Sequence, residues 1–388
     1  MTWLLIGLLG GCGSRVYTPP LAPLELGLAE SEGDHWGILE QAAGLMDTTV
    51  RQRSLSLLVQ HWPEPGAGPW AGRGLGDPSP YVQRKSIDAL GKRLEEEASR
   101  NALIQYLQRS DVSPFNTAKA AILLSQDSST NVLGLVEEHL LEERHHSERA
   151  PLLLAAAYLG SEQAPAPLAA ALRKGDFPLE MEFFLSIGDR PFPGLTEALV
   201  EGLSLFEEEL HLPIAYSLIR LDHPAGERLF REALKSETIE RQHEALDFLN
   251  QLLHPTADRL LRRDSRETAD HARLIQESRR PQMPRFAVAS LESPDRELRL
   301  QALQSLILWN QRFDAKPSFR RQVRAQAAES LRDLEASVQR EALRLMGTVG
   351  ARSDAKHISP FLGSEDPSHR VEAAGALLLI ELRANGGT

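Results

Sequence analysis

The chain has 388 residues, more than one compact core usually organises, so it forms either several domains or one long repeat array. Its formal net charge of -11 argues against a nucleic-acid partner, because phosphates are repelled unless basic residues gather on one face. The single cysteine excludes an internal disulfide. Aromatic residues are only 6%, and Leu and Ala supply the apolar content, which favours helices over β-sandwiches.

The chain opens with an apolar run over residues 3–9, which is too short to span a bilayer, where about 20 residues are needed. It has the length of a signal-peptide core, roughly 7–15 residues. The following string LGGC, which ends at Cys12, resembles a bacterial lipobox. The resemblance implies a signal peptide over residues 1–11 and lipidation of Cys12, and Gly13 in place of Asp implies the outer membrane. The alternative is an apolar N-terminus that frays or packs against the fold.

Residues 12–36 contain three prolines and mixed polarity, which is typical of an extended tether. Such a tether would connect the lipidated cysteine to a folded body. We expect that body, a helical solenoid, over residues 37–384.

An internal repeat dominates the remainder of the chain. Residues 77–91 (DPSPYVQRKSIDALG), 333–347 (DLEASVQREALRLMG) and 366–378 (DPSHRVEAAGALL) each begin with Asp and continue as an amphipathic helix. The Asp is predicted to cap the helix, and the Pro that follows Asp77 or Asp366 suits a first helical turn.

Two columns align across these helices, four residues apart. The first holds only small residues: Ser54, Ser86, Ala120, Ala155, Ala215, Ala245, Ala302, Ala342 and Ala373. The second holds only large aliphatic residues: Leu58, Leu90, Leu124, Leu159, Ile219, Leu249, Leu306, Met346 and Leu377. Residues four apart share a helix face, so the small residue lets a partner helix approach and the aliphatic residue fills the contact.

Five steps along the small column are 30 to 35 residues long, for example from 54 to 86 and from 342 to 373. Two longer steps, 155 to 215 and 245 to 302, each fit two units, with weak helices near Phe184 and over 271–278. The step from 302 to 342 predicts an insertion around residues 313–319. The pattern therefore predicts about eleven units of two helices each.

In these features the chain resembles the short bacterial form of the HEAT-repeat family. The resemblance implies an all-α solenoid whose helix pairs stack into a superhelix with a concave inner surface. It also implies a non-catalytic scaffold that binds a protein or peptide on that surface, because most members act as scaffolds and few are enzymes. No cofactor is expected.

Some proteins of this fold are enzymes. The deoxyhypusine hydroxylase group binds two irons through several His-Glu pairs, whereas His243-Glu244 is one such pair in this chain. The DNA glycosylases of this fold use a basic groove, which the acidic balance and the export signal disfavour. Bilin lyases share the short repeat, but no residue pattern here distinguishes that activity.

Metal binding is the alternative function. Residues 137–146 read EEHLLEERHH, and on one continuous helix His139, Glu142, Glu143 and His146 would share a face that could ligate zinc. The same pattern also fits a solvated helix face.

Two irregular stretches are weak candidates for ligand contact. Residues 63–78 (PEPGAGPWAGRGLGDP) are expected to form a long loop that carries Trp70, and residues 189–194 (DRPFPG) carry Phe192. Loops on a rigid scaffold often hold binding residues, but either aromatic ring could instead pack against a neighbouring helix.

Overall fold

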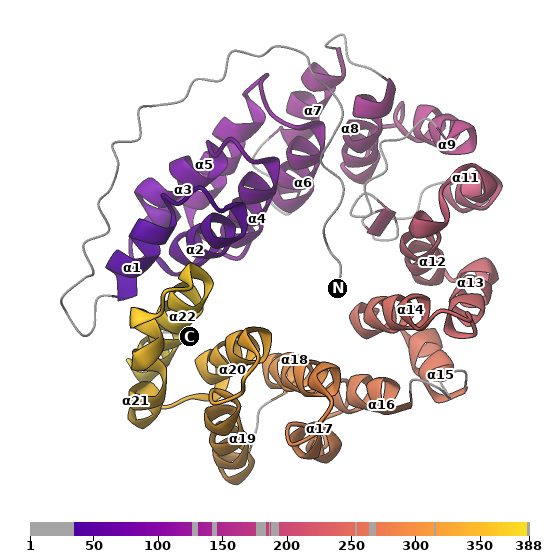
Figure 1. The fold of residues 1–388 in the computed structure, drawn as a ribbon. Coiled ribbons are helices and arrows are strands. Elements are labelled where there is room, and N and C mark those ends of the chain that lie inside the picture. Colours follow the sequence, from indigo (N-terminus) through magenta and orange to yellow (C-terminus); the bar gives the residue numbers. More distant parts are fainter. Residues whose placement is uncertain are drawn as a thin grey trace.

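The computed structural model describes residues 35–125, 131–141, 146–175, 184–185, 187, 194–252, 254–263, 269–313 and 316–385. These residues form α-helices and short 3-10 turns, and none of them lies in a β-strand, which confirms the all-α prediction. Figure 1 shows the helices in two concentric layers around a central opening. Within the described ranges, no helix is long and apolar enough to span a membrane.

The inner layer contains the helices of the predicted columns. Its members are α2 (Thr48–His61), α4 (Pro80–Gly91), α6 (Pro114–Leu124), α8 (His146–Tyr158), α12 (His211–Arg220), α14 (Ile239–Gln251), α16 (Ala269–Ser278), α18 (Arg296–Arg312), α20 (Ala336–Val349) and α22 (Pro367–Ala384).

The outer layer alternates with the inner one along the chain. Its members are α1 (His35–Ala42), α3 (Pro69–Leu75), α5 (Glu97–Leu107), α7 (Val132–Leu141), α9 (Pro165–Lys174), α11 (Leu195–Gly202), α13 (Pro224–Leu234), α15 (Pro255–Arg263), α17 (Arg285–Ser290), α19 (Pro317–Ser330) and α21 (Ala355–Ile358). Ten outer–inner pairs lie within the described residues, and helical residues 184, 185 and 187 mark the inner helix after α9. The prediction of about eleven units is therefore confirmed.

The small column is buried at every one of its nine positions. It allows close contact with the outer helices, as Ala215 of α12 illustrates. A Cβ atom on Gly226 of α13 would lie 2.6 Å from the Ala215 carbonyl oxygen, so the two helices meet almost backbone to backbone. The aliphatic column is buried as well, apart from the half-buried Leu159. The spacing of four residues thus produces the packing that it predicted.

The caps follow the prediction in part. The carboxylates of Asp47, Asp295 and Asp366 each accept a backbone N–H in the first turn of the following helix. The expectations for Asp77 and Asp333 are wrong, because α4 begins at Pro80 with Ser79 as its cap and α20 begins at Ala336 with Glu335 as its cap. The Asp77 carboxylate instead accepts the Ser79 amide and pairs with an arginine of the preceding unit.

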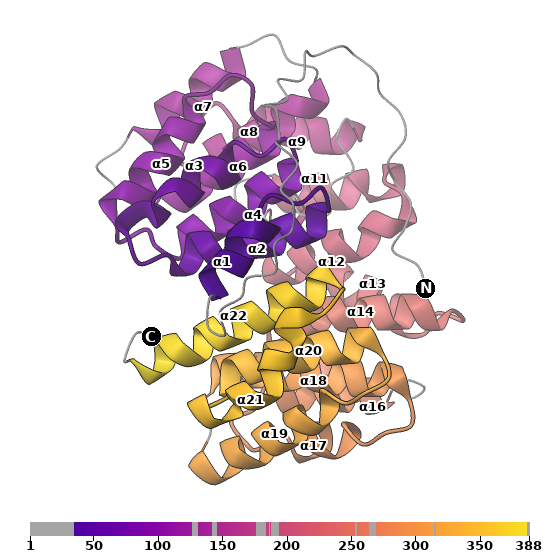
Figure 2. The ribbon, with the colours of Figure 1, turned by 60° about the vertical axis from the view of Figure 1, so that its left-hand side comes forward.

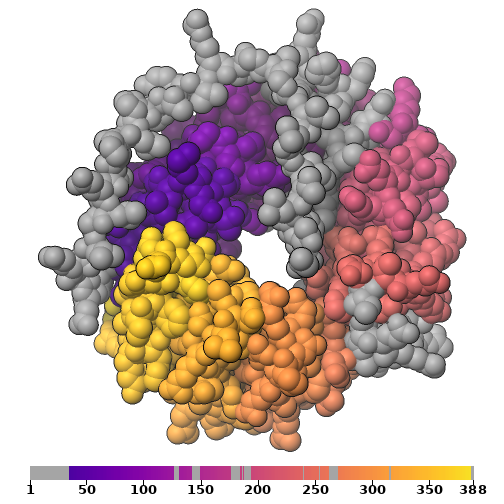
Figure 3. All heavy atoms as spheres, in the orientation of Figure 1, coloured from indigo at the N-terminus to yellow at the C-terminus, as the bar shows by residue number. Residues whose placement is uncertain are grey.

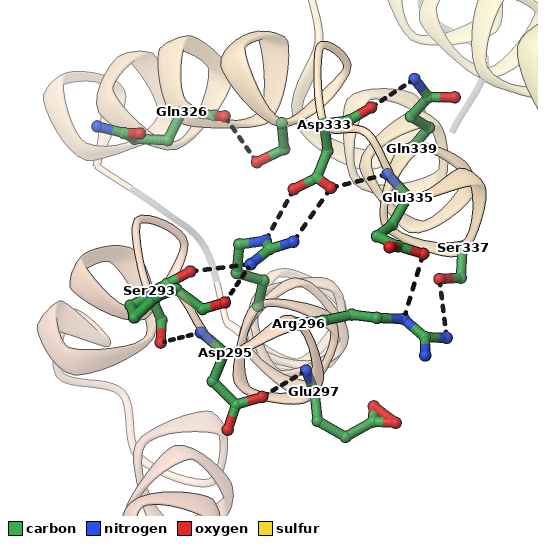
Figure 4. A network of polar contacts seen from close by, with 12 residues as sticks. Ser293, Asp295, Arg296, Glu297, Gln326, Asp333, Glu335, Ser337 and Gln339 are labelled. Atoms are coloured by element: carbon green, nitrogen blue, oxygen red, sulfur yellow. Dashed lines mark hydrogen bonds and ion pairs between the residues drawn. The ribbon is translucent and has the colours of Figure 1, made fainter. Parts of the chain in front are cut away.

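These turn aspartates connect neighbouring units. The guanidinium of Arg51 in α2 donates to both carboxylate oxygens of Asp77, at 2.9 and 3.1 Å. The guanidinium of Arg299 in α18 donates in the same way to Asp333, at 2.7 and 3.1 Å. Figure 4 shows the Asp333 network, in which Gln339 also donates to the Asp333 carbonyl oxygen. We call each such contact an Asp–Arg rung.

The prediction of a long loop over residues 63–78 is wrong, because this stretch forms a 3-10 turn (Pro65–Ala67) and the helix α3. Prolines begin both elements, where a missing N–H costs nothing. Gly66 has φ +66° and contacts the backbone of Ala98 so closely that a side chain would not fit. Tertiary packing therefore forms a helix that seven glycine-rich residues would not form alone.

The prediction of an insertion around residues 313–319 is also wrong, because the extra residues of this unit do not form a separate inserted segment. The extra length of this unit extends two helices, since α18 has 17 residues and α19 has 14. Phe319 lies in the first turn of α19, is buried, and packs edge-on against Trp309 of α18 with ring centroids 5.3 Å apart. Residues 314–315 lie outside the described residues.

The array closes into a ring. The last helix, α22, packs against α1 and α2 at the start of the described chain as well as against α20. Figure 2 shows α22 lying between these two groups, and Figure 3 shows N-terminal and C-terminal surfaces meeting beside a central opening. We call the contact of α22 with α1 and α2 the seam.

A candidate binding cavity at the seam

Residues of α22 belong to two hydrophobic cores at once. Val371, Ala374 and Leu378 share one core with α1 and α2. Ala373, Ala376, Leu377 and Ile380 share another with α18 and α20. A helix that is apolar on all sides is expected to be buried on all sides, and the α22 sequence VEAAGALLLI has this character. The apolar core therefore continues across the seam.

Gly375 makes the close approach of α22 to α2 possible. A Cβ atom at this position would lie 2.7 Å from Cδ1 of Leu57, which is itself buried in α2. Gly347 of α20 has the equivalent role on the other side, where a Cβ would lie 3.1 Å from Cα of Ala376. The last helix is thus held at short range by both neighbours.

A buried carboxylate joins the two sides. Glu372 of α22 is 3% exposed and accepts hydrogen bonds from Arg53 of α2, at 3.0 and 3.1 Å, and from Arg344 of α20, at 2.6 and 2.9 Å. Burial alone would raise its pKa, but the guanidiniums of Arg53 and Arg344 outweigh burial and hold the pKa below its ordinary value. Glu372 is therefore ionised, and it bridges the first and last parts of the ring.

Above this bridge the inner wall is hollowed into a cavity of about 900 Å³. Helices α2 and α4 form one side, α18 and α20 form the other, and the end of α22 contributes Leu379, Leu382 and Arg383. Leu57 and Ile307 add further apolar surface. The cavity therefore draws on both ends of the described chain and exists in this form only in the closed ring.

The charged side chains of the lining are mostly cationic. Five cations, Arg53, Lys85, Lys92, Arg344 and Arg383, face one carboxylate, Asp88, so the lining carries an excess of four positive charges (5 − 1). Counting the two acidic residues that pair with these arginines behind the wall, Glu341 and Glu372, leaves an excess of two (4 − 2). In a chain of net charge -11, this is a local concentration of the opposite sign.

The pKa of His61, which also lines the cavity, is affected by these positive charges. Burial lowers its pKa first, and the charges of Lys92, Arg53 and Arg93 lower it further, to about 4. The imidazole is therefore neutral at pH 7. The same cations, Lys92, Arg53 and Arg93, would favour an anionic ligand at this position.

Two of the lysines are open to a ligand. Lys92 is exposed, and its Nζ lies 2.9 Å from the Gln60 side-chain oxygen. Lys85 is exposed and lies 3.8 Å from Asp88, a carboxylate that Lys119 holds more closely, at 2.7 Å. Neither lysine is committed to a short ion pair within the described residues. The arginines, in contrast, already have partners in the ring wall: Arg53 and Arg344 donate to Glu372, and Arg383 donates to carbonyl oxygens of α20.

Of the predicted His/Glu cluster, the structure describes His139, in α7, and His146, the first residue of α8. Helix α7 ends at Leu141 and α8 begins at His146. His139 is buried, and its Nε2 lies 2.6 Å from the Leu107 carbonyl oxygen, so the ring packs between α7 and α5. Glu142, Glu143 and the His146 side chain lie outside the described residues. Among the residues that are described, no group of three or more His, Cys, Asp or Glu side chains could hold a metal ion.

Trp70 is part of the packing of the first units. It is 8% exposed and packs edge-on against Trp62 at 5.7 Å, and Trp62 packs in the same manner on Trp36 at 5.1 Å. The interpretation of Trp70 as a ring tucked against its neighbours is therefore the correct one. Phe192 and Cys12, the other two candidates, lie outside the described residues.

Sequence reasoning did not single out any of the cavity residues. One signal was available in Lys85, Asp88 and Lys92, which follow the spacing of one helix face beside the small column at Ser86. That spacing is equally typical of a solvated helix. Only the contact between distant helices shows that this face lines a hollow.

No protein-family model matches the chain, and no curated protein matches it. Among solved structures, an engineered protein is similar over 90% of this chain and 99% of its own, with 16% identity and a TM-score of 0.25. Human deoxyhypusine hydroxylase, in a complex with glycerol, is similar over 89% of this chain and 96% of its own, with 14% identity and a TM-score of 0.28. At TM-scores this low, neither similarity bears on a site or a reaction. The architecture itself, over the described residues, is an all-α ring of paired helices.

Proposed function

We propose that the protein is a non-catalytic scaffold that binds a protein or peptide partner on the inner wall of its ring. The cavity at the seam carries this proposal, because it combines apolar surface with exposed cations at a concave position. Concave surfaces that mix apolar area with a few charged groups are the usual form of binding sites. Its polar groups, chiefly lysines, arginines and glutamines, are suited to holding a ligand.

The metal-binding alternative has less support. The His139 ring is committed to the Leu107 carbonyl in the interior, away from solvent. Moving it to a metal would leave that carbonyl without its partner and would open the contact of α7 with α5.

We further propose that Cys12 is lipidated and that the ring is held at a bacterial outer membrane. This part rests on the resemblance of residues 9–12 to a lipobox and on the tether over residues 12–36. A lipid anchor requires no membrane-spanning helix. The mass of membrane-purified protein should show cleavage before Cys12 and a lipid adduct, and Cys12→Ser should release the protein from the membrane fraction. An uncleaved chain would exclude the anchor.

The scaffold proposal is tested by site-specific photo-cross-linking in cells that express the full chain. A benzophenone amino acid replaces Gln52, which lines the cavity, and, as the matched control, Lys356, which is exposed on the outer helix α21. We expect a discrete cross-linked protein from position 52 and none from position 356. Cross-links from position 356 alone, or from neither position, would contradict binding at the inner wall.

A further inference from the structure

We propose that the seam cavity binds an acidic peptide segment that carries aliphatic side chains, and that the bound segment holds the ring closed. This inference rests on the proposed scaffold function and names the chemistry of its ligand.

The positive charge of the lining favours a ligand that carries negative charge. Lys85 lies in α4 and Lys92 is the residue that caps its C-terminus, seven residues or two turns further along the same face. Both are exposed, and neither is held in a short ion pair within the described part of the chain. Two exposed ammonium groups, one bonded to a neutral amide and the other in a long ion pair, are matched by carboxylates spaced along an extended or helical segment.

The remaining lining determines that the ligand also has apolar groups. Ile307, Leu379 and Leu382 are half-buried, and they lie in the same cavity as the lysines. Covering them with leucine or valine side chains would remove apolar area from water on both partners, at about 25 cal/mol per Å². A small inorganic anion would satisfy the lysines but would leave this surface exposed.

The lining favours a peptide over a nucleic acid. Among the described residues, no Phe, Tyr or Trp lines the cavity, so it lacks the large aromatic rings on which successive bases usually stack. The overall charge of -11 also opposes the approach of a long phosphate backbone. A short acidic segment meets only the local positive field of the cavity.

Binding would stabilise the seam because the two sides of the cavity come from opposite ends of the described chain. The lysines lie on α4, whereas Ile307 lies on α18, and Leu379 and Leu382 lie on α22. A ligand that contacts both sides binds the closed ring and not an opened one. By linkage, it shifts the equilibrium towards closure by as much as it prefers that state.

The experiment measures fluorescence anisotropy of labelled twelve-residue peptides with the full-length protein. In the first peptide, Glu residues occupy one face of a helix and Leu residues the other. The second peptide has Lys in place of Glu, and the third has Ser in place of Leu. We expect binding of the Glu/Leu peptide, with affinity that falls as salt rises, and binding at least about tenfold weaker for the other two. Equal binding of the Lys/Leu peptide, or tighter binding of a single-stranded oligonucleotide, would overturn the proposal.

Two protein variants locate the site. The double substitution Lys85→Glu, Lys92→Glu should weaken binding of the Glu/Leu peptide by about tenfold or more. The matched control, Lys174→Glu with Lys356→Glu, makes the same charge change on outer helices and should bind normally. Circular dichroism and thermal melting confirm that both are folded. Equal losses in the two variants would exclude the cavity as the site.

The link to ring closure has its own readout. In the variant Gly375→Leu the seam is overpacked, so its ring should be open and its radius of gyration in small-angle scattering increased. Addition of the Glu/Leu peptide should close the ring and decrease that radius. A peptide that binds without changing the scattering would exclude the closure effect. Cross-linking at position 52 without binding of any Glu/Leu peptide would retain the scaffold function and reject this ligand class.

Discussion

Two interfaces between inner helices differ in how they are held: the one between α18 and α20, and the seam. At the first, the turns at the ring edge are joined by the Asp–Arg rung of Arg299 and Asp333. At the seam, Arg370 of α22 donates to the carbonyls of its own turn, at 2.6 and 3.2 Å, as Arg299 does. In the part of the chain that the structure describes, however, no carboxylate completes its rung.

At the seam, the connection is instead a buried carboxylate, Glu372 of α22, which pairs with both Arg53 and Arg344. Helices α18 and α20 have only α19 between them, so the chain already keeps them close and a single rung is enough to fix their register. The seam joins helices that are more than 300 residues apart in sequence, as the 319-residue separation of Arg53 and Glu372 shows. Closing so long a loop has an entropic cost that the buried bridge and the continuous core offset.

Loss of the Glu372 charge should have the largest effect. Glu372→Gln leaves Arg53 without its carboxylate and Arg344 with Glu341 alone, and we expect a loss of roughly 3 kcal/mol in the free energy of unfolding of the seam. Asp333→Asn, the equivalent change in the ordinary rung, should cost only about 1 kcal/mol. Urea unfolding of both variants makes the comparison. Equal losses would show that the seam bridge is an ordinary rung in another place.

Overpacking of the seam comes next. Gly375→Leu forces a side chain into Leu57, and we expect a cost of about 2 kcal/mol together with an increased radius of gyration in small-angle scattering. Helix content by circular dichroism should be unchanged, because the units remain intact. Gly72→Leu is the control, since no atom lies within 4 Å of a Cβ at that exposed helical position. An increased radius in the control variant would contradict the assignment to the seam.

His61 gives the seam region a pH dependence. Its pKa of about 4 in the folded chain lies below the ordinary value of 6.5, so the unfolded chain binds the proton first as the pH falls. Stability is therefore highest above pH 6.5 and is lost between pH 6.5 and 4. From pH 7 to pH 5 the loss is roughly 2 kcal/mol.

The measurement compares urea unfolding of the natural chain and His61→Gln at both pH values. Burial and the charges of Lys92, Arg53 and Arg93 are the causes of the low pKa, so the variant should lose about 2 kcal/mol less on acidification. The same acid-induced loss in both proteins would assign the effect to other groups.

Removal of a helix cap should cause the smallest loss of stability, and the loss should be similar at the seam and away from it. Asp366→Ala removes the cap of α22 at the seam, and Asp295→Ala removes the cap of α18 away from it. Each should cost about 1 kcal/mol, because the main contribution of a cap is to N–H groups of its own helix. The further contacts of Asp366, with His369 at 3.0 Å and Arg340 at 3.7 Å, involve a carboxylate that is about one third exposed and should add little. A much larger loss for Asp366 in thermal unfolding would indicate that this cap also supports closure.

The sequence by itself determined the repeating unit. The small and aliphatic columns, from Ser54 and Leu58 to Ala373 and Leu377, predicted which face of each inner helix is buried, because residues four apart share a face whatever the surroundings. The number of units followed from the spacing of the same columns. These are local properties, and nearest-neighbour packing in a repeat array preserves them.

Only the tertiary structure decided that the array closes and where its cavity lies. Closure depends on the small rotation between successive units, accumulated around the ring, and that rotation is a sum of many packing details. The helix at residues 69–75 was missed for a related reason, since its burial against Trp62 outweighs its poor helix propensity. Glu372 and Lys92 are single charges on amphipathic helices in the sequence, and only contact between the first and last units makes them a bridge and part of a site.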